Sequence, residues 1–196
     1  MTWQLAEKMT GWFIRRGFLM QDDYEVYVYC IDSLLAKIFF YMALILISLW
    51  LGILPVTICY YLGFTPFRYT AGGYHAKTDL SCVILTWTVY GASMWLVALS
   101  EQIPAIWVAH SSLILVLFAS AVALRHAPID HFNKPVSTAR KLLMRKWCLA
   151  FQVVFILVTL LLLGQHSYTL AFSIALGNGI AALFLLFAYY QRGIRI

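Results

Sequence analysis

The sequence predicts an all-α, polytopic integral membrane protein with about six membrane helices and an N-terminal interfacial helix. Of the 196 residues, 63% are hydrophobic and only 11% are charged, and the mean hydropathy is +0.82. A soluble domain carries about 25% charged residues. Long apolar runs with short polar connections are typical of membrane helices. Residues 1–18 hold no compact apolar stretch followed by small residues, so we expect no cleavable signal peptide.

Residues 1–20 predict an amphipathic helix that lies on the membrane surface. Its apolar side chains share one broad arc of the helical wheel: Trp3, Leu5, Ala6, Met9, Trp12, Phe13 and Ile14. Polar side chains lie opposite, with Arg16 as the exception. Gln21-Asp22-Asp23 is a start signal for a second helix.

The first long apolar run covers residues 38–67, with Gly52 and Pro55 in its middle. These 30 residues exceed the about 20 that one straight span needs. We therefore predict a short helical hairpin bent near Gly52–Pro55. Its arms are shorter than a comfortable span, which implies a thinned bilayer or burial among neighbours. The alternative is one long tilted helix with an external N-terminus.

Further spans are predicted at residues 80–99, 103–124, 149–163 and 168–190. Segment 125–147 holds six Lys and Arg residues, so we predict a basic loop on the cytoplasmic side. The loop at 68–77 then faces the cytoplasm too. The net charge is +6, but the basic residues cluster between spans, where they meet anionic headgroups. This pattern excludes nucleic acid as a partner and predicts one membrane-embedded domain over 1–196.

Residues 68–82 combine paired glycines, a histidine and a cysteine between two apolar segments. A cysteine thiolate is a nucleophile, favoured by a nearby base or a helix N-terminus. Thr78 or Asp79 is a natural N-cap, which places Cys82 in the first turn of the next helix. The N–H groups there favour a negative sulfur and can bind an oxyanion.

Helix geometry sets a condition on any chemistry between His75 and Cys82. In one continuous helix they would stand about 10 Å apart along the axis, whereas proton transfer needs about 3 Å. We therefore expect His75 in a loop that folds back over the helix start, with Gly72-Gly73 supplying the backbone freedom. On spacing alone, Cys82 also fits a small core residue, Arg68 a topology anchor and the glycines a turn.

The set Arg68, Gly72-Gly73, His75-Ala76-Lys77 and Cys82, in a basic chain of this length, resembles the accessory gene regulator B (AgrB) family. These are membrane cysteine endopeptidases that process precursors of cyclic quorum-sensing peptides. The amphipathic segment, the first apolar run and the loop at 127–135 also resemble the family, so the resemblance covers most of the chain.

The resemblance implies that Cys82 is the nucleophile and His75 its general base, later the acid that protonates the leaving amine. Arg68, Gly72 and Gly73 would shape the site. Spacing allows Asp79 to orient His75, but a helix cap is the role that we favour for it. No cofactor and no metal are implied.

The implied partner is a short AgrD-like precursor with an amphipathic N-terminal helix and an acidic C-terminal tail. Cleavage on the cytoplasmic side of the bacterial cell membrane would give a thioester on Cys82, which a Cys or Ser of the peptide converts to a thiolactone or lactone. The basic segment 125–147 either attracts the acidic tail or only anchors the chain at the membrane lipids. The family is compatible with a homodimer.

Three rival interpretations remain. A metal site of His126, Asp130 and His131 lacks the i, i+4 spacing of a zincin, and Pro128 interrupts any helix there. A transporter or export protein places polar groups within its spans. Here the spans carry little beyond small hydroxyls and Asn178, whose flanking glycines indicate close helix packing. The third rival interpretation is a membrane protein that serves only as a structural partner in signalling.

Overall fold

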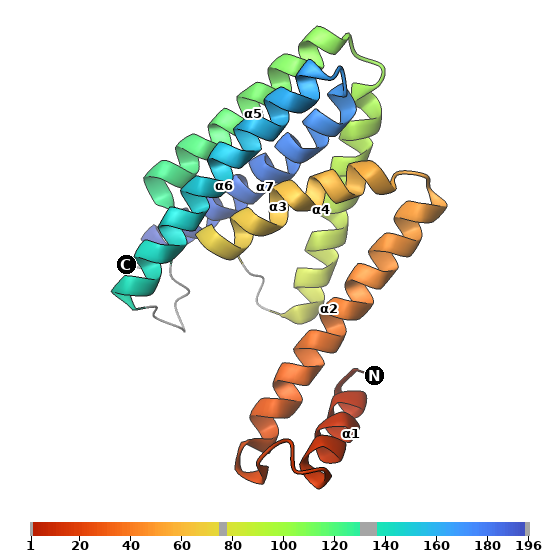
Figure 1. Ribbon diagram of the computed structural model, residues 1–196, viewed down its shortest axis with the longest axis vertical. Helices are drawn as coiled ribbons and strands as arrows, with labels where there is room; N and C mark the ends of the chain where they lie inside the picture. The colour runs from red at the N-terminus through yellow and green to blue at the C-terminus, as the bar shows by residue number, and fades with distance from the viewer. Residues whose placement is uncertain (1, 75–77, 130–136, 195–196) are drawn as a thin grey trace. The chain divides into compact units, whose positions relative to one another are not determined.

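The computed structural model describes residues 2–74, 78–129 and 137–194. Within these ranges the chain is helical and forms no strand (Figure 1). Its contacts divide it into two compact units, Met1–Leu54 and Pro55–Ile196. This division concerns contacts only, and the single peptidase domain stays a prediction.

The first unit consists of α1 (Thr2–Arg15), the short 3₁₀ helix η1 (Gln21–Asp23) and α2 (Tyr24–Trp50). α1 packs on α2, and Ala6, Thr10 and Val28 are buried. The predicted N-terminal helix is confirmed, but its buried side is a narrow strip of small residues. Trp3, Leu5 and Trp12, from the predicted apolar arc, remain exposed. They are available to lipid, and the position of α1 at the membrane surface stays a prediction.

The helix is interrupted between α2 and α3 (Leu54–Ala71), at the point where the sequence predicts a bend. Gly52 has a φ of +70°, a conformation that glycine adopts without strain. α2 is longer than the predicted arm, because nothing in its polar first turns interrupts the helix. Its 27 residues extend over about 40 Å, enough to cross a bilayer. The return of the chain to the same side stays a prediction.

The second unit contains most of α3 together with α4 (Asp79–Ser100), α5 (Ala105–His126), α6 (Thr138–Gly164) and α7 (Tyr168–Ile194). α7 contacts α4, α5 and α6 and is the most buried of the long apolar helices. Figure 1 shows α5, α6 and α7 side by side.

Five helices in the described part of the chain are long and apolar enough to cross a membrane. They are Gln21–Trp50, Leu80–Ser100, Ala105–His126, Thr138–Gly164 and Tyr168–Gln191. The predicted polytopic membrane fold is thereby confirmed, with a helix at each predicted span. α3 is the sixth long helix of the described residues, but it is not among these five.

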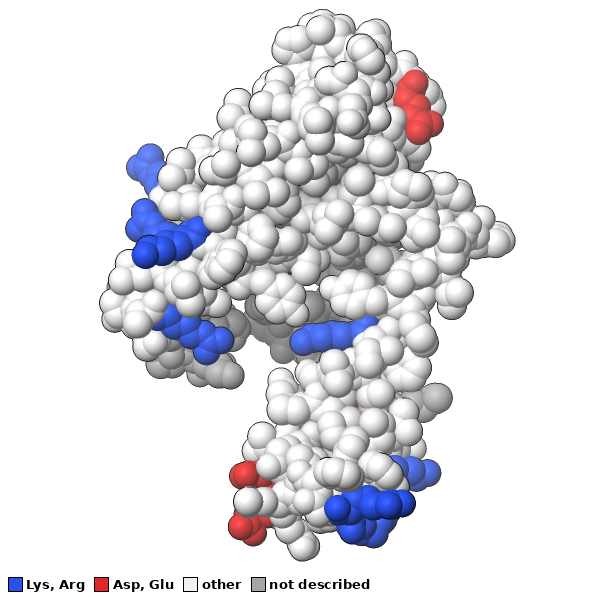
Figure 2. All heavy atoms as spheres, viewed as in Figure 1, with Lys and Arg blue, Asp and Glu red and all other residues white. Residues whose placement is uncertain are grey.

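Most of the described residues of the predicted basic loop 125–147 are helical. α6 begins at Thr138, so Arg140, Lys141, Arg145 and Lys146 lie on its first turns, and Arg125 lies in the last turn of α5. Ala, Leu, Met, Arg and Lys are all strong helix formers, which explains the early start. Figure 2 shows that charged side chains cover only a small part of the visible surface.

α3 and α7 approach each other closely at two glycines. A Cβ added at Gly63 would collide with the carbonyl of Ile174, and one at Gly177 with the carbonyl of Tyr60. Nearby, the Ser173 hydroxyl donates a 2.6 Å hydrogen bond to the Val56 carbonyl. Small residues that let two backbones meet are a main source of helix association in lipid.

A buried polar cluster joins α5, α6 and α7. The Gln152 amide donates to Asn178 Oδ1 at 3.2 Å, and the Asn178 amide donates back to Gln152 Oε1 at 3.0 Å. The Ser120 hydroxyl donates to the same Gln152 oxygen at 3.1 Å. Asn178 thus marks close helix packing, as predicted, whereas its pairing with Gln152 was not predicted from the sequence.

Replacing Gly177 by Leu should lower the stability of the protein by about 3 kcal/mol, because the new side chain meets backbone rather than a mobile side chain. In a detergent thermal melt we expect Tm to fall by about 6–12 °C. The matched control is Gly91→Leu on α4, where an added Cβ meets no atom within 4 Å. Equal shifts in the two variants would contradict the close α3–α7 contact.

Replacing Gln152 by Leu should cost about 1–2 kcal/mol, because it leaves the fully buried Asn178 amide unpaired. The double variant Gln152→Leu/Asn178→Leu should lose less than the sum of the two single variants. A thermal double-mutant cycle measures this coupling, and strictly additive losses would show that the two amides do not interact.

Candidate active site

The end of α3 forms a turn that only glycines fit. Gly72 and Gly73 have φ angles of +82° and +144°, and the Gly72 N–H donates to the Arg68 carbonyl at 3.1 Å. A Cβ on Gly72 would stand 2.8 Å from the Ile129 carbonyl oxygen, and a Cβ on Gly73 would collide with Arg68 Nη1. The two glycines therefore supply both the backbone conformation and the space beside Arg68.

Two backbone hydrogen bonds hold this turn against the rest of the unit. The Ile129 N–H, just beyond α5, donates to the Ala71 carbonyl at 3.0 Å, and the Tyr74 N–H donates to the Phe184 carbonyl of α7 at 3.1 Å. The Tyr74 ring also meets Phe187 edge-on, with centroids 4.9 Å apart. Residues 71–74 are thus fixed at both sides.

Arg68 lies in the last turn of α3, half-buried between aromatic rings. Its guanidinium carbon is 5.9 Å from the centroid of Phe64 and 5.3 Å from that of Phe184, within the range of cation–π attraction. Nη2 donates to the Tyr74 carbonyl at 2.9 Å. Burial lowers the pKa of Arg68 and the nearby Cys82 acts to raise it, but an arginine stays protonated in proteins.

α4 begins with a capping box, in which the cap is Thr78. The Ser81 N–H donates to Thr78 Oγ1 at 3.2 Å, and the Thr78 N–H donates to Ser81 Oγ at 3.3 Å. Of the two predicted caps, Thr78 is therefore confirmed, and Asp79 is instead the first residue of the helix. An acidic residue there also suits the helix dipole.

Cys82 lies in the first turn of α4, as predicted. Its own N–H donates to the Thr78 carbonyl at 3.0 Å, and the Ser81 N–H is already used by the cap. These two N–H groups are therefore already engaged at the start of the helix. Oxyanion binding by the first-turn N–H groups of α4 stays a prediction.

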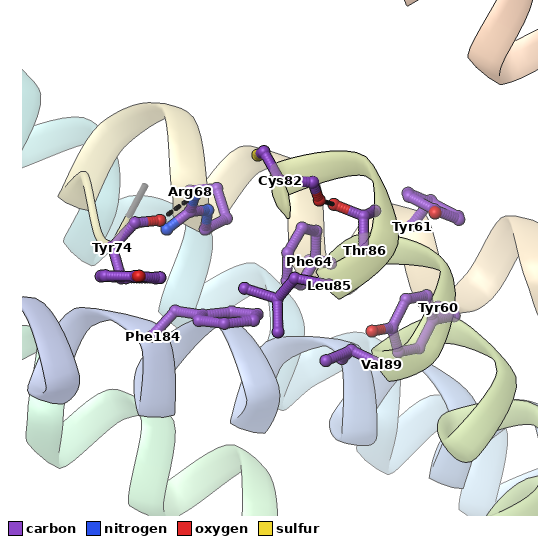
Figure 3. Close-up of a pocket in the computed structure, with 10 residues that line it drawn as sticks. All are labelled: Tyr60, Tyr61, Phe64, Arg68, Tyr74, Cys82, Leu85, Thr86, Val89 and Phe184. Carbon is purple, nitrogen blue, oxygen red and sulfur yellow. Dashed lines mark hydrogen bonds between the residues drawn. The ribbon is translucent and has the colours of Figure 1, made fainter. Parts of the chain in front are cut away.

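Cys82 and Arg68 line the same cavity, which has a volume of about 70 Å³ (Figure 3). Ten described residues line it: Tyr60, Tyr61, Phe64, Arg68, Tyr74, Cys82, Leu85, Thr86, Val89 and Phe184. None of these ten is acidic. The cavity thus combines a thiol and a cation within a mostly apolar wall.

The structure brings together four of the predicted site residues: Arg68, Gly72, Gly73 and Cys82. His75 lies outside the described residues, and so does the side chain of Asp79. Of the rejected metal trio, only His126 is described, with its ring 4.4 Å from that of Tyr189.

Sequence reasoning missed the aromatic wall of the cavity. Tyr60, Phe64 and Arg68 recur every four residues, so they share one face of α3, and this spacing was the available signal. Cys82, Thr86 and Val89 likewise share a face of α4. Phe184 gave no local signal, because its role depends on how α7 packs against α3.

Comparison with known proteins gives one match. No curated protein and no solved structure is detectably similar to the chain. The model of the family "Accessory gene regulator B" (AgrB) matches residues 6–187, a range that includes the whole site. The chain therefore belongs to the AgrB family, which takes part in the processing of agr quorum-sensing peptides.

Proposed function

We propose that this protein is a membrane-embedded cysteine endopeptidase that removes the C-terminal tail of an AgrD-like precursor peptide and promotes its cyclisation. Cys82 is the nucleophile, and His75 is the general base and then the general acid. The observation that carries this proposal is the shared cavity of Cys82 and Arg68 at the capped start of α4. It occurs in a chain whose family processes such peptides.

The reaction begins when Cys82 Sγ, having given its proton to His75, attacks the scissile carbonyl carbon. A C–S bond forms and the carbonyl electron pair moves to oxygen. When this intermediate collapses, the C–N bond breaks, His75 returns the proton to the leaving amine, and a thioester remains on Cys82. A Cys or Ser of the peptide then attacks the thioester, which frees Cys82 and closes a thiolactone or lactone ring.

Cyclisation requires that water does not reach the thioester first. Exchange of one thioester for another keeps the activation of the acyl group, whereas hydrolysis discards it. The cavity is small, about 70 Å³, and its walls include Phe64, Leu85 and Phe184. An apolar wall of this kind favours attack by a nucleophile of the bound peptide over attack by bulk water.

We place the site at the cytoplasmic side of the bacterial cell membrane. The hydrogen bond from Ile129 to Ala71 brings the ends of α3 and α5 to the same end of the unit, and α5 ends with Arg125. α6 starts nearby in sequence with Arg140 and Lys141. The positive-inside rule assigns such an end to the cytoplasm.

Changing Cys82 or His75 to Ala should abolish tail removal, with a loss of roughly 10⁴-fold or more, because each is essential to the acyl transfer. The assay follows a candidate precursor by mass spectrometry in proteoliposomes. The matched control is Cys30→Ala, since Cys30 is a free, exposed cysteine on α2 and should leave the rate unchanged. Unchanged cleavage in Cys82→Ala would end the peptidase proposal and favour the transporter.

Neutralising Arg140 and Lys141 together to Gln should raise KM several-fold and weaken its dependence on salt, with little change in kcat. The physical reason is that the basic turns of α6 attract the acidic tail through screened electrostatics. A precursor whose tail acids are replaced by amides serves as the control and should not respond. If both precursors respond alike, the basic residues only anchor the helix.

A further inference from the structure

Arg68 is a partly buried cation whose hydrogen-bonding capacity is mostly unused. A guanidinium carries five N–H donors, and the described residues give it one acceptor, the Tyr74 carbonyl. Nη1 is buried and has no hydrogen-bond partner among them. No acidic residue lines the cavity in the described part of the chain. Among the described residues, this cation therefore has no anionic partner.

The surroundings hold the guanidinium in one place. It lies over the rings of Phe64 and Phe184, and the missing Cβ of Gly73 leaves the room that Nη1 occupies. The hydrogen bond to Tyr74 O fixes the other nitrogen. A donor that is fixed before the reaction stabilises developing charge without reorganisation.

The two N–H groups beside Cys82 do not supply a free hydrogen-bond donor for an oxyanion. The N–H groups of Ser81 and Cys82 are both engaged by Thr78. A tetrahedral intermediate on Cys82 nevertheless carries a full negative charge on oxygen, which requires a donor in an apolar site. Among the described residues that line the cavity with Cys82, Arg68 is the cation (Figure 3).

We propose that Arg68 is a further catalytic residue, which donates hydrogen bonds to the oxyanion formed when Cys82 attacks the scissile carbonyl. This inference rests on the proposed peptidase function. The C–S bond forms, the carbonyl electron pair moves to oxygen, and Arg68 stabilises that oxygen without giving up a proton. On collapse the pair returns to the carbonyl, the C–N bond breaks, and the amine leaves with the proton that His75 held.

The first test asks whether Cys82 reacts beside an available cation, and it needs no substrate. Iodoacetate and iodoacetamide alkylate the same sulfur and differ in charge. Their rate ratio at one cysteine cancels the accessibility and the thiolate fraction of that cysteine. Mass spectrometry of the purified protein reads the ratio at Cys82 and, in the same molecules, at the exposed Cys30. We expect the iodoacetate-to-iodoacetamide ratio at Cys82 to exceed that at Cys30 by about tenfold or more.

Variants then test whether the preference of Cys82 for iodoacetate is due to Arg68. Arg68→Gln should bring the ratio at Cys82 down to that of Cys30, and Arg68→Lys, which keeps the charge, should retain most of it. The matched control is Arg145→Gln, because Arg145 also donates to a main-chain carbonyl, Leu124 O at 3.3 Å, but does not line the cavity. An equal ratio at Cys82 and Cys30 in the wild type overturns the proposal, and this comparison stands even if Arg68→Gln does not fold.

The second test uses cleavage of the precursor. Arg68→Gln should lower kcat by about 10²–10³-fold with KM nearly unchanged, since the oxyanion exists only after attack. Arg68→Lys should recover part of kcat. If Cys82→Ala is inactive while Arg68→Gln keeps its kcat, only this inference fails. If Cys82→Ala still cleaves, the proposed function itself fails.

Discussion

The close contact between α3 and α7 is the constraint on which the site depends. The pairs Val56–Ser173 and Tyr60–Gly177, and then Arg68–Phe184, follow one another along both helices. The two helices therefore run parallel, with their backbones in contact where Gly63 and Gly177 lack side chains. Because of this register, the last turn of α3 lies beside Phe184, and the position of Arg68 is determined by this contact. A wider spacing of the helices would separate Arg68 from its aromatic support.

The glycines after α3 extend the same arrangement to the chain that precedes α4. Gly72 lets the backbone pass close to Ile129, and Gly73 leaves room for the guanidinium of Arg68. The hydrogen bond from Tyr74 to Phe184 then ties the segment to α7. The packing of α3 on α7, the turn at Gly72-Gly73 and the position of Arg68 therefore depend on one another. A substitution that disturbs one of them disturbs the other two.

Much of the fold could be predicted from the sequence, because membrane helices carry a strong local signal. Apolar length located the spans, Gly52 marked the break after α2, and Thr78 was identified as a cap. The early start of α6 differs from the sequence prediction, since basic residues between apolar runs indicate a loop although they also form helix. The pairing of Gln152 with Asn178 and the contact of Phe184 with Arg68 join distant parts of the chain, and no local pattern encodes them.

The most direct test of the account is to trap the acyl-enzyme. A precursor whose cyclising Cys or Ser is replaced by Ala has no internal nucleophile, so the thioester on Cys82 should persist. Intact-mass and peptide-mapping spectrometry should then find the N-terminal part of the precursor attached to Cys82 through a bond that hydroxylamine cleaves. Release of the tail with no adduct on Cys82, or with the adduct on another residue, would contradict the role assigned to this cysteine.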